Sequence, residues 1–349
     1  MAFSLFGKKG VIGVDIGSSS IKVVELREGG KKAYQLMNFG IAPLPSDVVV
    51  DGTIMNTSLV AETLKSILGN LRLKTKDAAT SVAGTAVLIK KISLPTMTEA
   101  ELEESIQWEA EQYITNINEV NIDFHILGPG TEEGQMSVLL VGAKKEIINE
   151  RVNVLVEAGL NPVVVDVDAF AIENSFEINY PAPDPEHLVV LVNVGASVTN
   201  INIVKGSASL FTRDISVGGR VFSEEIQKSL RMSSDEAEAM KISLTPETVT
   251  PEIDKVLRMT SDNIANEIKK SQDFLGIGGE VKVAGIYLSG GASKTVGLKD
   301  VIAEKTGAPV EIMDPFRNVE YNPRVFDPNY LNNISPAASL AFGLGLRKK

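Results

Sequence analysis

Residues 11–26 read VIGVDIGSSSIKVVEL and decide the fold class of this chain. A short apolar stretch, Val11–Asp15, precedes the small-residue turn Gly17–Ser20, and a second apolar stretch, Ile21–Leu26, follows the turn. Apolar runs of this length on both sides of a Gly/Ser turn are typical of hairpin strands. The stretch therefore predicts a strand, a tight turn and a second strand at the start of the chain.

The same pattern returns in the second half, where residues 188–202 read LVVLVNVGASVTNIN. Asn193 takes the place of Asp15, so the offset is 193 − 15 = 178 residues, about half of the 349-residue chain. A repeat of this length predicts two similar α/β domains that face each other across a cleft, rather than a solenoid of short repeats.

Both turns have a composition that suits phosphate binding. Gly and Ser allow a ligand to approach the backbone closely, and successive N–H groups in a turn form a concave anion site. Asp15 can hold Mg²⁺ through water molecules, and Lys22 can neutralise a phosphate as a point charge. For either turn alone, an ordinary Gly/Ser turn is the simpler interpretation. The occurrence of the pair at matching positions favours a nucleotide site.

Five motifs together resemble those of the actin-like ATPase superfamily. The stretches 11–26 and 188–202 resemble its two phosphate loops, and YLSGGASKTVGLKDVI at 287–302 resembles its adenosine loop. VDVDAFAIEN at 165–174 and SPAASLAFGLG at 335–345 resemble its two connecting helices. The resemblance covers nearly the whole chain and implies a duplicated, ribonuclease H-like α/β fold around a nucleotide cleft.

A more specific resemblance is to the PilM family of type IV pilus assembly proteins, which is itself similar to the cell-division protein FtsA. The acidic motif ELEESIQWEAEQYI at 101–114, which follows SLPTMTEA, favours this branch. The resemblance implies a cytoplasmic scaffold for pilus assembly and twitching motility. It also implies a partner, the cytoplasmic N-terminal tail of the membrane protein PilN, and contacts with pilus motor ATPases.

The superfamily resemblance implies ATP and Mg²⁺ as cofactors and gives roles to individual residues. Asp15 would organise Mg²⁺ through water, Lys22 would contact phosphate, and Asp168 would orient the attacking water. Backbone N–H groups would bind phosphate at Gly17, Ser18, Ser19, Ser20, Gly195, Ala196 and Ser197. The remaining residues would surround the ribose and the adenine: Glu238, Lys241, Gly290, Gly291 and Ala292. Without the family, Glu238 and Lys241 are interpreted as a plain i, i+3 helix pair.

One position departs from the superfamily pattern. The second phosphate strand usually ends in Asp, whereas this chain has Asn193. Asn adds no negative charge to hold a metal, and phosphoryl transfer depends mainly on the positions of metal and water. We therefore expect nucleotide binding with slow hydrolysis at most.

The negative charge is concentrated in one segment. Residues 92–143 contain ten acidic residues and no Lys or Arg, against a net charge of −11 for the whole chain. A capping box at Thr98 and Glu101 opens a helix here, and two strands follow. The segment is therefore predicted to be a separate acidic subdomain, either a solvated surface or a docking site for a basic partner. If it is a docking site, the basic tail is expected to add to an exposed strand or to pack on residues such as Ile106 and Tyr113. Within it, a half-buried packing role is favoured for Trp108 over a role as a partner anchor.

These features define a domain plan. Residues 1–91 and 144–185 form the first actin-like domain, to which 335–349 return, and 92–143 form the inserted subdomain. The second domain comprises 186–222 and 281–334, and 223–280 form a helical insert within it. The boundary between halves is placed at the Pro-rich stretch Pro181–Pro185.

Composition excludes several classes of protein. The chain has no Cys and only two His, far apart at His125 and His187, which excludes disulfides and Cys- or His-rich metal sites. The net charge of −11 argues against general nucleic-acid binding. No apolar run approaches the roughly 20 residues of a membrane span, and residues 1–10 do not resemble a secretory signal. We therefore expect a cytoplasmic protein.

Two other functions share the duplicated fold. A sugar-kinase-like phosphotransferase would need an aspartate base aimed at a substrate hydroxyl, for which Asp166 and Asp168 are candidates. A filament-forming, FtsA-like cytoskeletal protein would need contacts between copies that do not close into a ring. The sequence leaves the oligomeric state open. The nucleotide-dependent scaffold is favoured because the acidic segment has no evident use in a sugar site and because the sequence does not show filament contacts.

Overall fold

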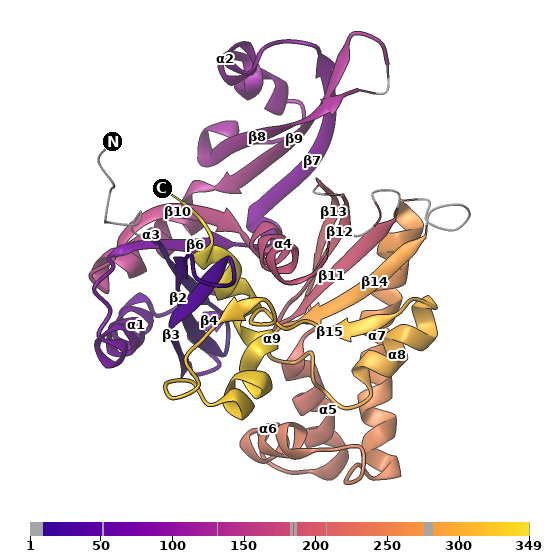
Figure 1. Ribbon diagram of the computed structural model, residues 1–349. Helices are drawn as coiled ribbons and strands as arrows, with labels where there is room; N and C mark the ends of the chain where they lie inside the picture. Colours follow the sequence, from indigo (N-terminus) through magenta and orange to yellow (C-terminus); the bar gives the residue numbers. More distant parts are fainter. Residues whose placement is uncertain are drawn as a thin grey trace.

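The computed structural model describes residues 10–50, 52–130, 132–181, 184, 187–206, 208–275 and 282–348. The N-terminal stretch 1–9, part of the predicted boundary Pro181–Pro185 and the end of the predicted helical insert lie outside the described residues. The fold is an α/β arrangement with two main sheets and a smaller sheet that projects from one side (Figure 1).

The first main sheet has six strands in the order β10-β6-β1-β2-β3-β16. Helices α1 and α3 cover one face, and their apolar residues, such as Leu64 and Leu155, pack against the first hairpin. The bounds are β1 Ile12–Ile16, β2 Ser20–Glu28, β3 Tyr34–Pro43, β6 Asp77–Val82, β10 Asn161–Val167, β16 Val319–Glu320, α1 Thr57–Leu71 and α3 Lys145–Glu157, with a two-residue pair β4 Val49–Val50 and β5 Thr53–Ile54 beside them.

The second main sheet has five strands in the order β13-β12-β11-β14-β15. Helices α5, α7 and α8 cover its outer face with residues such as Phe222, Ile264 and Ile302, and α6 packs beside α5. The bounds are β11 Leu188–Val194, β12 Thr199–Lys205, β13 Ala208–Ile215, β14 Val283–Ser289, β15 Val310–Ile312, α5 Gly219–Leu230, α6 Ser234–Ser243, α7 Pro251–Phe274 and α8 Leu298–Thr306.

Strand pairing confirms the predicted duplication. In the first sheet β1 pairs antiparallel with β2 and parallel with β6. In the second sheet β11 pairs antiparallel with β12 and parallel with β14. The register places Asp15 opposite Lys22 and Asn193 opposite Asn200, so the two predicted phosphate turns occupy equivalent positions.

Two helices lie between the main sheets and join the halves. They are α4, Asp168–Asn179, and α9, Pro328–Gly345, and both contribute to an apolar cluster that contains residues of both sheets. The helices approach so closely that a Cβ on Gly343 would lie 1.7 Å from the backbone oxygen of Ala171. The crossing point of the two halves therefore depends on a residue without a side chain.

Helix α9 begins earlier than the sequence pattern predicts. The pattern places the last helix near Pro336–Gly343, whereas α9 starts at Pro328 and keeps Pro336 in its interior. Proline has no N–H, which leaves the carbonyl of Asn332 without its usual helical donor. The ammonium group of Lys294 donates to that carbonyl at 2.7 Å. A contact from the predicted adenosine loop therefore helps the helix to continue through the proline.

The smaller sheet belongs to the inserted subdomain and has the order β7-β9-β8. Its elements are β7 Val87–Pro95, α2 Glu99–Ala110, β8 Val120–Pro129 and β9 Gln135–Lys144, with short 3-10 turns η1 Gly84–Ala86 and η2 Ile117–Glu119. The predicted boundary at residues 91 and 92 falls inside β7, because residues 87–95 form one continuous strand that pairs with β9 along its whole length. The subdomain stands away from the rest of the molecule (Figure 1).

The capping box that opens α2 is present, with Thr98 and Glu101 bonded reciprocally. The buried face of α2 consists of Leu102, Ile106 and Ala110, which pack on the sheet. Trp108 is 72% exposed, so the half-buried packing role favoured for it is wrong. It lies on the outer face because the helical period turns that position away from the sheet. Among the described residues, no helix is long and apolar enough to cross a membrane.

Candidate nucleotide site

The first predicted phosphate turn is a tight hairpin with a buried ion pair at its base. The N–H of Gly17 donates to the carbonyl of Ser20 at 3.1 Å, which closes the turn. This N–H is therefore already bonded, and the phosphate-binding role predicted for it is wrong. Asp15 is 7% exposed, and its carboxylate lies 3.0 Å from the ammonium group of Lys22. A Cβ on Gly17 would be 3.1 Å from that ammonium group. The hairpin therefore places a carboxylate and a cation directly beside the turn.

The second predicted turn is tied to the start of α5. The N–H of Gly195 donates to Val198 at 2.9 Å, and the carbonyl of Gly195 accepts from the N–H of Gly219 at 2.8 Å. The carbonyl of Ala196 accepts from the N–H of Arg220 at 2.7 Å. The hydroxyl of Ser197 is buried and has no hydrogen-bond partner. A buried donor of this kind is costly unless a ligand or water satisfies it.

The predicted ribose and adenine residues meet beside this second turn. The ammonium group of Lys241 lies 2.6 Å from the carboxylate of Glu238 and donates to the carbonyl of Gly219 at 2.9 Å. The N–H of Ala292 donates to Val194 at 3.0 Å. The structure therefore brings α6, the start of α5 and the loop 290–292 together.

Gly290 is constrained by its surroundings as well as by its conformation. Its φ is +89°, and a Cβ there would lie 2.3 Å from the carbonyl oxygen of Val194 and 2.7 Å from the side-chain oxygen of Asn193. A left-handed φ without steric cost is a property of glycine. The loop after β14 can therefore lie directly against the end of β11, as the predicted contact with adenine requires.

Two buried groups below the first turn were not found by sequence analysis. Arg151, on α3, donates from its guanidinium group to the carbonyls of Ile16 and Gly52, at 2.8 Å each. Burial lowers the pKa of Arg151, while the charges of Asp168 and Asp15 counteract this. Ser81, on β6, hydrogen-bonds to the Asp168 carboxylate. The only sequence signal for Arg151 is a charged residue within the apolar pattern of its helix.

Asp168 lies at the first position of α4 and has an altered acidity. Burial raises the pKa of its carboxyl group from 3.8 to about 7, and the charges of Asp15 and Asp214 add to this effect. The hydrogen bond from Ser81 and the charge of Arg151 act in the opposite direction. A carboxylate with a pKa near 7 can exchange a proton with water at neutral pH.

Both carboxylate oxygens of Asp166 already have hydrogen-bond partners within the protein. One of its carboxylate oxygens lies 2.6 Å from the Nε of Arg347, and the other accepts the N–H of Val167 at 2.8 Å. A catalytic base must have a free lone pair that points at the substrate. Asp166 therefore does not provide the base that a sugar-kinase-like reaction would need.

Replacing Asp168 with asparagine is expected to raise the melting temperature at pH 8 by about 2–4 °C or more, with a smaller gain at pH 5. The folded-state pKa of this carboxyl is raised, so the folded protein holds the proton more tightly than the unfolded chain. Stability therefore falls as pH rises from about 4 to about 7. Asparagine removes the charge and still offers an oxygen to Ser81. Thermal unfolding at both pH values checks the prediction.

Asp166→Asn is the matched control, because it weakens the ion pair with Arg347 and should lower the melting temperature at pH 8. A lower melting temperature of Asp168→Asn at pH 8 would show that the Asp168 charge stabilises the fold.

The residues present fit a nucleotide with a divalent cation. Asp15 offers a carboxylate, Lys22 offers a cation, and the Ser197 hydroxyl is a buried donor without a partner. Among the residues that the structure describes, no cluster of three or more Asp, Glu or His could hold a metal alone. A divalent cation would therefore depend on Asp15, water and the phosphates of the nucleotide, which suits the reluctance of Mg²⁺ to lose its water.

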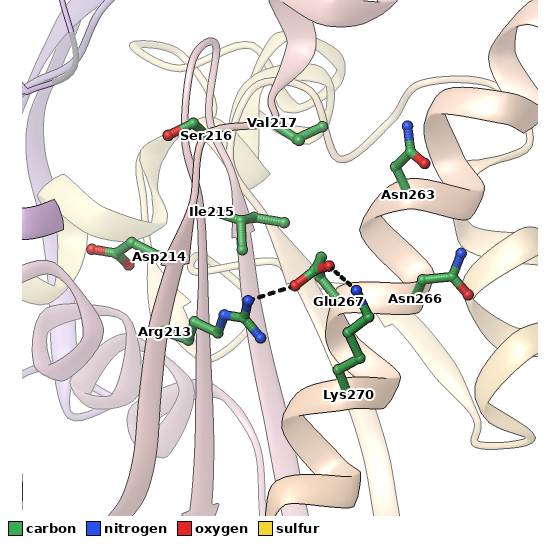
Figure 2. Close-up of a pocket in the computed structure, with 9 residues that line it drawn as sticks. All are labelled: Arg213, Asp214, Ile215, Ser216, Val217, Asn263, Asn266, Glu267 and Lys270. Atoms are coloured by element: carbon green, nitrogen blue, oxygen red, sulfur yellow. Dashed lines mark hydrogen bonds and ion pairs between the residues drawn. The ribbon is translucent and has the colours of Figure 1, made fainter.

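A separate pocket lies between β13 and α7 (Figure 2). Its volume is about 470 Å³, and it contains none of the predicted nucleotide-binding residues. Figure 2 shows Glu267 between Arg213 and Lys270, at 2.8 Å and 2.7 Å. Its charged lining groups are thus largely paired with one another.

Comparison with known proteins relates this geometry to a family and a fold. The family model described as type IV pilus assembly protein PilM matches residues 13–349. A chain solved in a "PilM-PilN type IV pilus biogenesis complex" is 29% identical, with 97% of this chain and 98% of that chain covered and a TM-score of 0.85.

Two more distant structures have a similar fold. The ethanolamine utilization protein EutJ from Carboxydothermus hydrogenoformans is 16% identical over 98% of this chain and 90% of that chain, with a TM-score of 0.60. MreB5 of Spiroplasma citri, solved with AMPPNP, is 14% identical over 96% and 94%, with a TM-score of 0.53. The predicted duplicated actin-like α/β fold is thus confirmed.

Proposed function

This chain belongs to the type IV pilus assembly protein PilM family, and from that premise we propose that it is an ATP-binding scaffold of the inner-membrane pilus assembly platform. In this proposal it binds the cytoplasmic tail of a membrane partner in a nucleotide-linked way. The observation that carries the nucleotide part is the meeting of Lys241, Gly219 and the loop 290–292 beside a hairpin with a buried, unpartnered Ser197 hydroxyl.

The proposed nucleotide is ATP with Mg²⁺, held between the two hairpins. Asp15 and Lys22 would hold the metal and phosphate on one side, and the N–H groups of Ala196 and Ser197 would hold phosphate on the other, because the N–H of Gly195 already donates to the carbonyl of Val198. Asp168 would position water through its carboxylate, whose pKa of about 7 allows proton exchange at neutral pH. Asn193 adds no charge for the metal, so turnover would be slow.

The proposed partner is the N-terminal cytoplasmic tail of PilN. A solved relative that covers 97% of this chain was determined in a PilM-PilN complex, which supports the transfer of that partner to this protein. The protein would then be cytoplasmic and peripheral to the inner membrane through PilN. Contacts with pilus motor ATPases remain part of the same proposal.

The acidic inserted subdomain is the proposed docking region. Its exposed α2 face carries Glu103, Glu104 and Glu111 beside Trp108, and no Lys or Arg occurs between residues 92 and 143. Opposite charge speeds association with a basic tail, and an exposed aromatic ring adds apolar and cation–π contact.

Ile106 and Tyr113, which are expected to contact the tail, differ in their exposure to solvent. Ile106 is 6% exposed and belongs to the core of the subdomain, so its predicted part in docking is wrong. Tyr113 is 36% exposed, and the ammonium group of Lys90 lies 4.0 Å from its ring centre. One face of Tyr113 is thus occupied, whereas β8 and β7 are edge strands to which an extended tail could add.

Reversing the charges of the α2 face is expected to weaken tail binding by about tenfold or more at low salt. The variant is Glu103→Lys with Glu104→Lys and Glu111→Lys, which places like charges opposite a basic tail. Fluorescence titration of a labelled PilN N-terminal peptide measures the affinity at two salt concentrations. The wild-type affinity should fall as salt rises, because exposed charge pairs are screened.

The control is Glu62→Lys with Glu157→Lys and Glu224→Lys, which changes the net charge equally at three exposed positions outside the subdomain. If both triple variants bind the peptide as wild type does, the acidic subdomain is not the docking site.

A further inference from the structure

Four side chains form a continuous polar row across the second sheet. Ser289, Asn193, Asn200 and Asp214 lie on the adjacent strands β14, β11, β12 and β13, and the register pairs each of them directly with the next. The row begins at the loop that includes Gly290 and ends on the edge strand β13. It therefore runs from the proposed nucleotide site to the border of the sheet.

Hydrogen bonds link the row from end to end. The Ser289 hydroxyl donates to Asn193 Oδ1 at 3.4 Å, and Asn193 Nδ2 donates to Asn200 Oδ1 at 2.9 Å. Asn200 Nδ2 then donates to Asp214 Oδ1 at 2.7 Å. The other carboxylate oxygen of Asp214 accepts the backbone N–H of Gly84, in the other half of the molecule.

The hydrogen bonds of the row are all donated in the same direction, from Ser289 toward Asp214. Each of the two asparagines accepts with its oxygen on one side and donates with its NH₂ on the other, and the final carboxylate accepts twice. Turning either amide round would place an acceptor against an acceptor. An aspartate in place of Asn193 could not donate to Asn200, which gives the Asn at this position a structural reason.

The far end of the row reaches the base of the inserted subdomain. Gly84 has a φ of +75° and opens the turn η1, which leads directly into β7. Strand β13 lies against both η1 and β7. The side chains of Asp214 and Arg213 lie on opposite sides of β13 (Figure 2). The Asp214 carboxylate thus joins the second sheet to the root of the acidic subdomain.

We propose that Asp214 is a positioning residue that couples nucleotide binding to the orientation of the inserted subdomain, through the row Ser289–Asn193–Asn200–Asp214–Gly84. This inference rests on the proposed function, in which the cleft binds ATP and the subdomain binds the tail. The hairpin and loop that would contact nucleotide flank Asn193, so a shift there changes the geometry of the row. The bond between Asp214 and Gly84 is made in one arrangement and weakened in the other.

Coupling requires that each ligand favour one of two arrangements, and it acts equally in both directions. The row is a structural connection whose geometry can change when either the nucleotide or the tail binds. It crosses between the halves at a single carboxylate, so one substitution removes the link. The charge of Asp214 also raises the pKa of Asp168, so Asn200→Ala, which breaks the row and keeps that charge, is tested beside it.

The test compares Asp214→Ala and Asn200→Ala with Arg213→Ala. Arg213 is the neighbour of Asp214 on β13, and its ion pair with Glu267 lies on the opposite side of the strand, so it is a matched control. For each protein, the affinity for a labelled PilN N-terminal peptide is measured with and without Mg-AMPPNP. The ratio of the two affinities is the coupling factor.

Wild type and Arg213→Ala are expected to show a coupling factor of about fivefold or more. Asp214→Ala and Asn200→Ala should show a factor close to one while they still bind Mg-AMPPNP. Hydrogen exchange gives a second readout. Mg-AMPPNP should alter exchange in the segment 83–90 of wild type and leave it unchanged in Asp214→Ala.

Two outcomes would overturn the inference, and they are distinguishable. If Asp214→Ala keeps the full coupling factor, the row does not carry the coupling, and the proposed function still stands. A wild-type protein that binds both ligands without any coupling contradicts the nucleotide-linked part of the proposed function and the row together.

Discussion

Replacing Lys22 with alanine is expected to lower the affinity for Mg-ATP by about 10- to 100-fold, the effect of losing a hydrogen bond to a charged group. Lys22 is held beside the first turn by Asp15, at 3.0 Å. Its ammonium group would neutralise phosphate at short range in a partly buried place, where screening by salt is weak. The substitution also leaves Asp15 without its partner, and a bare carboxylate repels phosphate.

Isothermal titration of wild type and Lys22→Ala with Mg-ATP measures this effect. Lys65→Ala is the matched control, because Lys65 is exposed on α1 and should leave the affinity unchanged. The double variant Asp15→Asn with Lys22→Ala separates the loss of the cation from the exposure of the carboxylate. An unchanged affinity in Lys22→Ala would mean that the first hairpin does not bind phosphate.

Replacing Gly343 with alanine is expected to destabilise the fold by at least about 1–3 kcal/mol, the usual range for overpacked cores. The added Cβ would lie 1.7 Å from the carbonyl oxygen of Ala171, and neither a Cβ nor a backbone oxygen can move away by a side-chain rotation. Helices α4 and α9 would have to separate. Because they lie between the two main sheets, separation would loosen the core on both sides.

Thermal unfolding and the soluble yield of the variant measure the loss. Gly69→Ala is the matched control, since Gly69 lies inside α1 and a Cβ there would meet nothing within 4 Å. Alanine is the better helix former, so the control should keep or raise the melting temperature. If Gly343→Ala melts at the same temperature as the wild type, α4 and α9 do not cross as closely as described.

Local patterns in the sequence were sufficient for the elements that depend on near neighbours. The turns Gly17–Ser20 and Gly195–Ser197 and the capping box at Thr98 appear in the structure as predicted. The pair Glu238 and Lys241 also forms, because residues three apart on a helix lie on one face. The matching positions of the two hairpins were visible because the repeat keeps the same order of strand, turn and strand.

Other features depend on contacts between distant parts of the chain and could not be predicted in this way. Alternation of apolar and polar residues along a strand predicts which residues share a face. It does not give the register of that strand against another strand many residues away. The row that joins Asn193, Asn200 and Asp214 exists only through that register. The burial of Arg151 likewise depends on carbonyl groups of Ile16 and Gly52, about a hundred residues or more from it.

The sequence by itself determined that this chain is a duplicated α/β protein with two phosphate-type turns and an acidic inserted segment. Each of these features is carried by short-range periodicity, turn residues and charge. The tertiary structure decided that α9 continues through Pro336, because the ammonium group of Lys294 donates to the carbonyl that this proline leaves without a helical donor. It also decided which polar groups meet between the halves, because pairing of strands far apart in the chain brings Asp214 to Gly84.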